Sequence, residues 1–272
     1  MQDDKAKKKK NKQQLVFKPY KKGNWHSAAA AKRGLRILLY YLVFIFMNVI
    51  LGSALQFENT VLRVTLNLLL VLAYATLLYM DGARLGESEV ALGEITYARE
   101  QAGKAVDPKD LDNCFHPLKG VFICLVGVLV PLLLAIPHAF LAEKQVYALQ
   151  SLPSWVNGYA GHDEIALPLQ YYAQEYSFRL EDFLRMAVRM VIFPFANIAT
   201  TDNADALLLV DRLSPLLICL PALGFPLGYL TGPRSRALVH GDIATSTKRY
   251  DRRRNKAIKA RKARTEKKNE LI

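Results

Sequence analysis

Charged and apolar residues are sorted along this chain more sharply than a water-soluble domain requires. Residues 1–36 hold 12 Lys and Arg against Asp3 and Asp4, and residues 232–272 hold 14 Lys and Arg against four acidic residues. Because the net charge of the whole chain is +13, the segment between these basic ends is slightly acidic, and it is also strongly apolar. This pattern predicts a membrane-embedded centre with two basic tails.

Four segments of the apolar centre are long enough to cross a bilayer, which takes about 20 apolar residues in helical form. Irregular backbone cannot face lipid, so each span is expected to be a helix. Only residues 57–60 join the first two spans, which predicts an antiparallel helical hairpin. The predicted spans cover residues 35–56, 61–80, 120–142 and 213–232.

Both ends of the chain are predicted to lie in the cytoplasm, because Lys and Arg concentrate in the cytoplasmic segments of membrane proteins. Of the 37 Lys and Arg, 31 fall in residues 1–36, in 81–119 or in the C-terminal tail. Two ends on one side require an even number of spans. We therefore predict an all-α integral membrane protein with four transmembrane helices, in a bacterial-type plasma membrane.

Residues 178–194 form a fifth apolar segment that carries five charged residues, most of them on one helix face. Two arginines near the middle of a span would cost about 2.5–3.5 kcal/mol each on insertion scales. An amphipathic helix lying in the external interface avoids that cost and keeps the number of spans even. A fifth span, or a re-entrant element from Phe178 to about Asn197, remains the alternative.

The predicted organisation has three parts. Residues 1–34 are a basic cytoplasmic tail, 35–232 are the membrane domain, and 233–272 are a second basic cytoplasmic tail. Within the membrane domain, 81–119 is a cytoplasmic helical loop with a helix over 87–101 and a second, short helix capped by Asp107-Pro108. Residues 143–212 form an external segment rich in aromatic residues, which favour the headgroup level.

The densest basic clusters are expected to contact anionic lipid headgroups or a cytoplasmic partner. A basic segment beside a span gains about 1 kcal/mol per Lys or Arg from an anionic membrane surface. The same charges neutralise RNA phosphates, so a ribosome or an acidic protein is an alternative partner, although no recognised nucleic-acid motif is present. The clusters are Lys7, Lys8, Lys9 and Lys10, and Arg252, Arg253 and Arg254.

Arg185 and Arg189 are also candidates for contact with an anionic headgroup or ligand. The alternative is that Arg185 pairs within its own helix, with Glu181 and Asp182, while Arg189 extends to headgroups.

The polar residues inside the predicted spans include Asn48, Asn67 and His138, with Arg63 near the end of the second span. Such residues mark hydrogen bonds between helices or a path for a solute. A structural bond between Asn48 and Asn67 is the simpler expectation, because the two lie at similar depth on paired helices. No acidic residue lies inside any predicted span, which argues against a proton relay through carboxylates. Gly224 and Gly228 form a small-xxx-small pair that permits close helix approach.

No catalytic, cofactor-binding or metal-binding residue is predicted. Cys114 and His116 lack the further ligands that zinc needs, and the cluster of residues 162–164 has no nucleophile beside it. Hydrolase, phosphate-loop and dinucleotide-binding motifs are absent from the sequence. We expect a non-enzymatic accessory or scaffold subunit. The alternatives are a small transporter or channel subunit, and a membrane-tethered RNA- or ribosome-binding protein.

Overall fold

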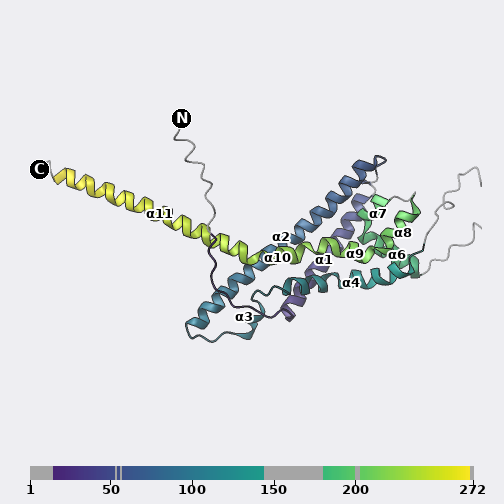
Figure 1. Cartoon of the computed structure of the whole chain (residues 1–272), viewed down its shortest axis with the longest axis horizontal. Coiled ribbons are helices and arrows are strands. Elements are labelled where there is room, and N and C mark those ends of the chain that lie inside the picture. Colours follow the sequence, from purple (N-terminus) through teal and green to yellow (C-terminus); the bar gives the residue numbers. More distant parts are fainter. Residues whose placement is uncertain (1–14, 53, 56, 144–179, 200–202, 270–272) are drawn as a thin grey trace, which may run out of the picture. The chain divides into compact units, whose positions relative to one another are not determined.

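The structure is a computed structural model that describes residues 15–52, 54–55, 57–143, 180–199 and 203–269. Every regular element in these residues is a helix (Figure 1), which confirms the all-α part of the predicted fold. The helices are α1 (Ala28–Gly52), α2 (Thr60–Gln101), α3 (Pro108–Asp112), α4 (Lys119–Leu141), α6 (Leu180–Val191), α7 (Phe193–Ala199), α8 (Ala204–Arg212), α9 (Ser214–Ala222), α10 (Gly224–Leu230) and α11 (Gly232–Asn269).

Four helices begin at side chains that accept a hydrogen bond from a backbone N–H of the first turn. Ser27 Oγ caps α1 at 3.2 Å, Asn59 Oδ1 caps α2 at 3.0 Å and Asn203 Oδ1 caps α8 at 3.0 Å. The predicted cap at Asp107 is confirmed, since its Oδ1 accepts from the Lys109 N–H at 3.0 Å. These starts are therefore set by local sequence.

Three helices, α1, α2 and α4, are long and apolar enough to cross a membrane. Many of their large apolar side chains point outward, among them Leu42, Leu72 and Leu133, which are 54%, 64% and 61% exposed. An apolar surface of this extent is typical of helices that face lipid rather than water. Helix α8 and the segment 214–230 pass the same test only as a pair, bent by 62°.

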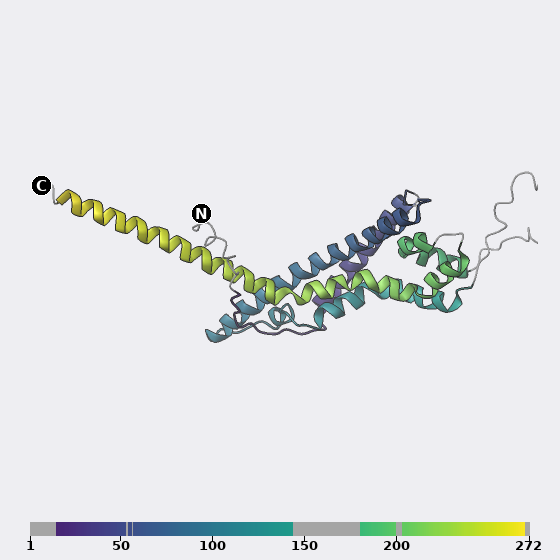
Figure 2. The ribbon, with the colours of Figure 1, turned by 45° about the horizontal axis from the view of Figure 1, so that its top comes forward.

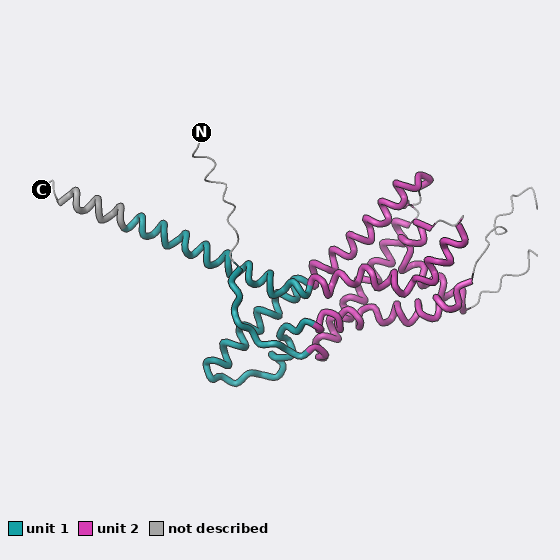
Figure 3. The backbone as a smooth tube through the Cα atoms, viewed as in Figure 1, with its two compact units in different colours: residues 1–24, 83–117, 229–272 teal, residues 25–82, 118–228 magenta. Residues whose placement is uncertain are grey.

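The chain forms two compact units (Figure 3). Unit 1 comprises residues 1–24, 83–117 and 229–272, and unit 2 comprises residues 25–82 and 118–228. The boundary falls inside α2, so this helix contributes to both units. Unit 1 gathers nearly the same residues that the sequence predicts to be cytoplasmic, whereas unit 2 contains the apolar helices.

The interior of unit 1 is built around Tyr229. Its ring stacks on Phe115, with ring centres 4.9 Å apart, and its hydroxyl group bonds to the buried carboxylate of Glu89. The ring of Tyr20 meets Phe115 edge to face at 6.0 Å. Residues 15–24 are also held by backbone bonds, since the Lys21 N–H donates to the Gly93 carbonyl at 3.1 Å. Part of the predicted N-terminal tail is thus packed in a folded unit.

Two predicted spans differ from the helices that contain them. Helix α1 covers 28–52 rather than 35–56, because the alanines after the Ser27 cap extend it at its start. Helix α2 begins near the predicted residue 61 but runs past residue 80 to Gln101, joining the predicted loop helix. Asp81-Gly82 does not end it, since the residues that follow favour a helix and pack in unit 1.

The predicted single span over 213–232 is wrong as one helix. It is interrupted at Leu213, Leu223 and Thr231, between α8, α9, α10 and α11. A proline follows each interruption within three residues: Pro215, Pro226 and Pro233. Proline has no N–H and its ring clashes with the carbonyl four residues earlier, so it favours a break at such positions.

The predicted approach of a second helix to Gly224 and Gly228 is confirmed. A Cβ atom at Gly224 would overlap the carbonyl oxygen of Ala75 in α2, and one at Gly228 would overlap the carbonyl oxygen of Tyr79. The backbones of α10 and α2 are therefore in direct contact, an arrangement that only glycine permits at these two positions.

Several predictions concern residues outside the described ranges: the cluster Lys7, Lys8, Lys9 and Lys10, the aromatic residues of 144–179, and the cluster of residues 162–164.

Candidate functional site

Unit 2 contains a buried ionic cluster centred on Asp211, near the end of α8. The guanidinium group of Arg189 in α6 donates to both carboxylate oxygens of Asp211, at 3.0 and 2.6 Å. His138 Nε2 in α4 lies 3.5 Å from Oδ1 of the same carboxylate. The side chains of Asp211 and His138 are only 2% and 3% exposed. One buried carboxylate therefore links three helices, and its bidentate pair with arginine fixes their geometry.

A second ion pair lies on α6 itself. Arg185 Nη1 donates to Asp182 Oδ1 at 3.1 Å, and Arg185 is buried. This pairing within the helix is one that the sequence predicts, with Asp182 rather than Glu181 as the observed partner. Arg189 differs from its prediction because its partner is Asp211 rather than a lipid headgroup.

Helix α6 turns the charged side chains of Asp182, Arg185 and Arg189 toward the rest of unit 2, whereas Glu181 is exposed. Arg185, Val188 and Val191 are buried, whereas Phe183 and Met186 are about half exposed. A helix in water would show the opposite arrangement, with its charged face outward. The inward charges and outward apolar side chains suit an element whose outer surroundings are apolar.

The break between α6 and α7 follows from Pro194. Because Pro194 has no N–H, the carbonyl of Met190 four residues earlier loses its helical donor. Asn48 of α1 replaces that donor, since its Nδ2 lies 3.2 Å from the Met190 oxygen and 3.4 Å from the Val191 oxygen. Neighbouring helices commonly satisfy backbone groups that prolines leave free in membranes.

At the break between α9 and α10, the thiol group of Cys124 takes the place of a missing backbone donor. Pro226 leaves the carbonyl of Ala222 without its helical donor, and Cys124 Sγ of α4 lies 3.4 Å from that oxygen. Both broken helices are thus tied to an unbroken apolar helix through a carbonyl that a proline has freed.

Asn67 pairs with α7 rather than with Asn48. Its Oδ1 accepts from Asn197 Nδ2 at 3.4 Å, and Asn197 also donates to the Gly52 carbonyl at 3.4 Å. The Asn67 amide group itself donates to the Arg63 carbonyl at 2.9 Å. The polar side chains of α1 and α2 are therefore used to hold the segment 190–197, and the expected direct bond between Asn48 and Asn67 is not formed.

We expect Asn48→Leu to lower the free energy of unfolding by about 1–2 kcal/mol, because the Met190 carbonyl loses its donor. In a Pro194→Ala background the restored N–H can bond to Met190, so the same substitution should cost less. The measurement is a double-mutant cycle from unfolding by sodium dodecyl sulfate in detergent micelles. Equal costs in the two backgrounds would show that Asn48 does not compensate for Pro194.

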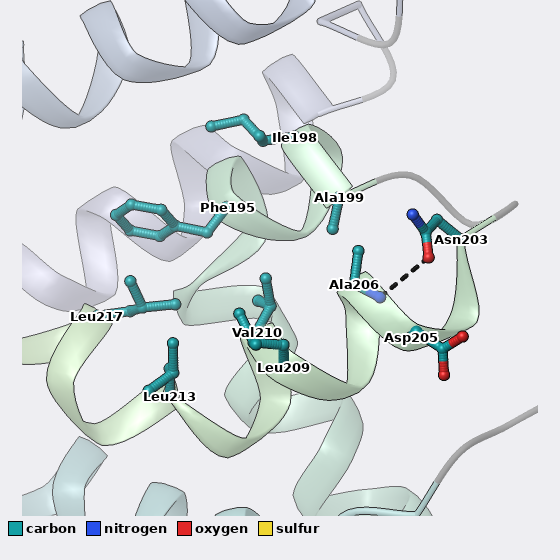
Figure 4. Close-up of a pocket in the computed structure, with 10 residues that line it drawn as sticks. All are labelled: Phe195, Ile198, Ala199, Asn203, Asp205, Ala206, Leu209, Val210, Leu213 and Leu217. Carbon is teal, nitrogen blue, oxygen red and sulfur yellow. Dashed lines mark hydrogen bonds between the residues drawn. The ribbon is translucent and has the colours of Figure 1, made fainter.

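An open apolar groove of about 690 Å³ lies between α7, α8 and α9 (Figure 4). Its polar residues are Asn203 and Asp205, where α8 begins, and the Asn203 oxygen already accepts from the Ala206 N–H at 3.0 Å. The remaining walls are alanine, leucine, isoleucine, valine and phenylalanine side chains. Such a lining suits lipid tails or another apolar helix better than a polar solute.

Unit 1 anchors the start of α11 through Glu94 of α2. Glu94 accepts from Arg236 Nε at 3.1 Å, and its carboxylate lies 2.8 Å from His240 Nε2. Ala237 and His240 are buried beside this contact. Beyond it α11 continues as one helix (Figure 2), and residues 246–258 are exposed at every position. Arg252, Arg253 and Arg254 lie in this exposed part.

Cys114 and His116 do not form a shared site. Cys114 is buried and its Sγ lies 3.2 Å from the Asp110 carbonyl oxygen, whereas the backbone N–H of His116 donates to the Tyr229 hydroxyl at 3.4 Å. In the described part of the chain, no group of three or more His, Cys, Asp or Glu side chains is arranged to hold a metal ion.

Reasoning from the sequence missed Asp211 and Asn197. Asp211 lies two residues before the predicted fourth span, so it was assigned to the external segment, and Asn197 lies only at the end of the alternative re-entrant element. The available signal was a lone carboxylate next to a span in a chain with intramembrane His138. An intramembrane polar residue requires a partner, and Asp211 lies on the same predicted side as the end of the span that contains His138.

Comparisons with models of known protein families, with curated proteins and with solved structures found no match.

Proposed function

We propose that this chain is a four-span protein of a bacterial-type plasma membrane, with both ends in the cytoplasm, and that it is a non-enzymatic accessory or scaffold subunit. It holds the basic helix α11 at the cytoplasmic face, where the helix contacts anionic lipid or a cytoplasmic partner. The observation that carries this proposal is the anchoring of α11 in a folded unit, with a long, exposed, basic continuation.

The composition of unit 1 supports an even number of spans. Its three segments are far apart in sequence yet bond directly to one another: the Val16 N–H donates to the Ala237 carbonyl at 3.2 Å, and Lys21 bonds to Gly93. A compact unit cannot be divided by a bilayer, so all three segments belong on one side. The chain between each pair of consecutive segments must then cross the membrane an even number of times.

In the proposed topology the chain crosses the membrane four times. Helix α1 and the first part of α2 provide two crossings before residue 83. Helix α4 provides a third after residue 117, so the chain must return before residue 229. The broken stretch α8–α10 is the apolar candidate for this fourth crossing, and the excess of Lys and Arg in unit 1 favours the cytoplasmic side.

The interior of unit 2 supports a scaffold rather than a moving or catalytic assembly. Its buried polar side chains bond largely to neighbouring helices, as Asn48, Arg189 and the pair Asn67–Asn197 show. These contacts tie the broken helices to unbroken ones and favour one fixed arrangement.

We expect cysteines introduced by Ala160→Cys and Ala260→Cys to react from opposite sides of the membrane. In intact cells a membrane-impermeant maleimide should label position 160, and position 260 should react only after permeabilisation. The parent for both variants should lack Cys114, Cys124 and Cys219, so that no native thiol contributes. Labelling of position 260 in intact cells would exclude the proposed topology.

The scaffold role is tested by purifying cross-linked complexes of the full chain and of a variant that ends at residue 246. Partners bound through α11 should be lost from the shortened chain, while unit 2 still unfolds at the same denaturant concentration. A high-salt wash should release the partners but leave the protein in the membrane. Release of the protein itself by salt would contradict membrane integration.

A small transporter or channel subunit is the second candidate, and a different observation favours it. Asn48 Oδ1, Arg185 Nε and Ser214 Oγ are buried in unit 2 without a hydrogen-bond partner in the described residues. Broken helices with such groups line solute paths in transporters. Rapid reaction of Asn48→Cys and Asn67→Cys with small water-soluble thiol reagents would favour this candidate, whereas no reaction would favour the packed scaffold.

A further inference from the structure

Helix α11 consists of a packed start and an exposed continuation. The start is fixed in unit 1, where Gly232 contacts the backbone of Gly86 and Glu94 bonds to Arg236 and His240. From residue 246 to residue 258 every side chain is exposed. The continuation thus projects from an anchored base as a helix without packing of its own.

The continuation has a charge density close to that of one nucleic-acid strand. Residues 247–269 hold 12 Lys and Arg against Asp251 and Glu266. At about 1.5 Å per residue this segment is about 34 Å long, or one net positive charge per about 3.4 Å. Phosphates along one strand of double-stranded DNA follow at about 3.4 Å of helix axis, which sets the order of magnitude for a nucleic-acid duplex.

Like-charged side chains within this helix repel one another when no partner is bound. Lys248 and Arg252, Arg249 and Arg253, and Arg252 and Lys256 are like charges four residues apart. Each such pair destabilises a helix by about 0.2–0.5 kcal/mol, and few acidic residues offset them. Anions that lie against the helix would remove this repulsion, so the segment gains stability from a polyanionic partner.

Insertion into a bilayer surface is a poor match for this segment. A helix that lies in the membrane interface needs a continuous apolar face. The large apolar residues of the exposed part are Tyr250 and Ile258, and Arg254 lies between them on the same face at a spacing of four. Insertion of these two side chains would bring a guanidinium group into the apolar layer with them.

The basic positions surround the helix. At about 100° per residue, the six Lys and Arg positions of 247–258 leave no empty sector wider than about 120°. A flat membrane or a single straight duplex offers phosphates to one side of a helix. A folded RNA, whose duplexes pack against one another, offers phosphates on several sides at once.

We propose that α11 from residue 247 onward binds folded, double-helical RNA through its phosphate backbone, without reading base sequence. This inference rests on the proposed function, since the helix must lie in the cytoplasm to meet RNA in the cell. It names the class of partner that the scaffold holds at the membrane.

The test uses the full chain in nanodiscs of phosphatidylcholine, which carry no net charge. The probes are a fluorescent RNA three-way junction, a straight DNA duplex with the same number of phosphates, and vesicles that contain phosphatidylglycerol. The RNA junction is expected to bind most tightly, and its affinity should fall steeply with salt. A junction of scrambled sequence with the same secondary structure should bind equally well.

Two triple variants distinguish an effect of charge on RNA affinity from an effect of misfolding. Replacement of Arg252, Arg253 and Arg254 by glutamine should weaken RNA binding at least about tenfold and lower the salt slope by about 2–3. Replacement of the same residues by lysine retains the charges and should change affinity less than about threefold. Both variants should unfold like the parent protein, because these side chains are exposed.

Three results would overturn the inference: equal affinity for the straight DNA duplex, tighter binding to the anionic vesicles, or RNA affinity that the glutamine variant leaves unchanged. These results are independent of topology, because both faces of a nanodisc are accessible. Cysteine labelling at position 260 separately decides whether the proposed function fails.

Discussion

Gly228→Ala is expected to destabilise the protein, although alanine favours a helix over glycine by about 1 kcal/mol. The added methyl group would overlap the carbonyl oxygen of Tyr79, a backbone atom that cannot move without displacing α2. Overpacking of this kind costs about 1–3 kcal/mol in addition to cancelling the gain in helix propensity. The measurement is the free energy of unfolding in detergent micelles, for the parent protein and the variant.

Leu227→Ala is the matched control, because Leu227 is the preceding residue of α10 and is 59% exposed. It should change the free energy of unfolding by less than about 0.5 kcal/mol, the usual range for surface substitutions. A Gly228→Ala variant more stable than the parent would mean that helix propensity decides this position. The direct contact between the backbones of α10 and α2 would then be excluded.

Asp211→Asn is expected to lower the free energy of unfolding by about 3 kcal/mol, the low end for breaking a buried ion pair. The substitution keeps the size of the side chain but removes the charge that Arg189 and His138 share. Arg189 is 22% exposed, so water can solvate its charge in part after the pair with Asp211 is lost. The expected loss of stability is therefore at the low end of the range. Unfolding by sodium dodecyl sulfate measures the effect.

A double variant, Asp211→Asn with Arg189→Met, tests whether the cost comes from the pair. It should be less destabilised than the sum of the two single variants, because no unpaired charge remains buried. Arg212→Gln, an exposed neighbour that also changes the charge by one unit, is the control and should have little effect. Additive costs in the double variant would contradict direct pairing of Asp211 with Arg189.

The ionic cluster matters for how a broken span is held. Helix α8 joins α9 at a sharp bend, so the backbone alone does not set the direction of α8. Asp211 binds the end of α8 to α4 and α6, while Asn48 and Cys124 bind the freed carbonyls of the other breaks. The irregular half of unit 2 therefore depends on specific polar contacts, whereas α1 and α2 depend on apolar composition.

Sequence alone establishes those features whose physical cause is local. The apolarity of α1, of the first part of α2 and of α4 follows from runs of residues, the cap of α3 follows from Asp107, and the approach to α10 follows from the spacing of Gly224 and Gly228. Each of these signals is contained within a few neighbouring residues.

The tertiary structure alone decided which residues become partners. Asn67 bonds to Asn197, 130 residues away, and Asn48 bonds to a carbonyl that Pro194 frees 142 residues away. The inward orientation of the charged face of α6 depends on Asp211 in another helix, and the continuation of α2 to Gln101 depends on packing in unit 1. A buried polar group needs a hydrogen-bond partner. The helical periodicity of the sequence does not predict which distant residue is that partner.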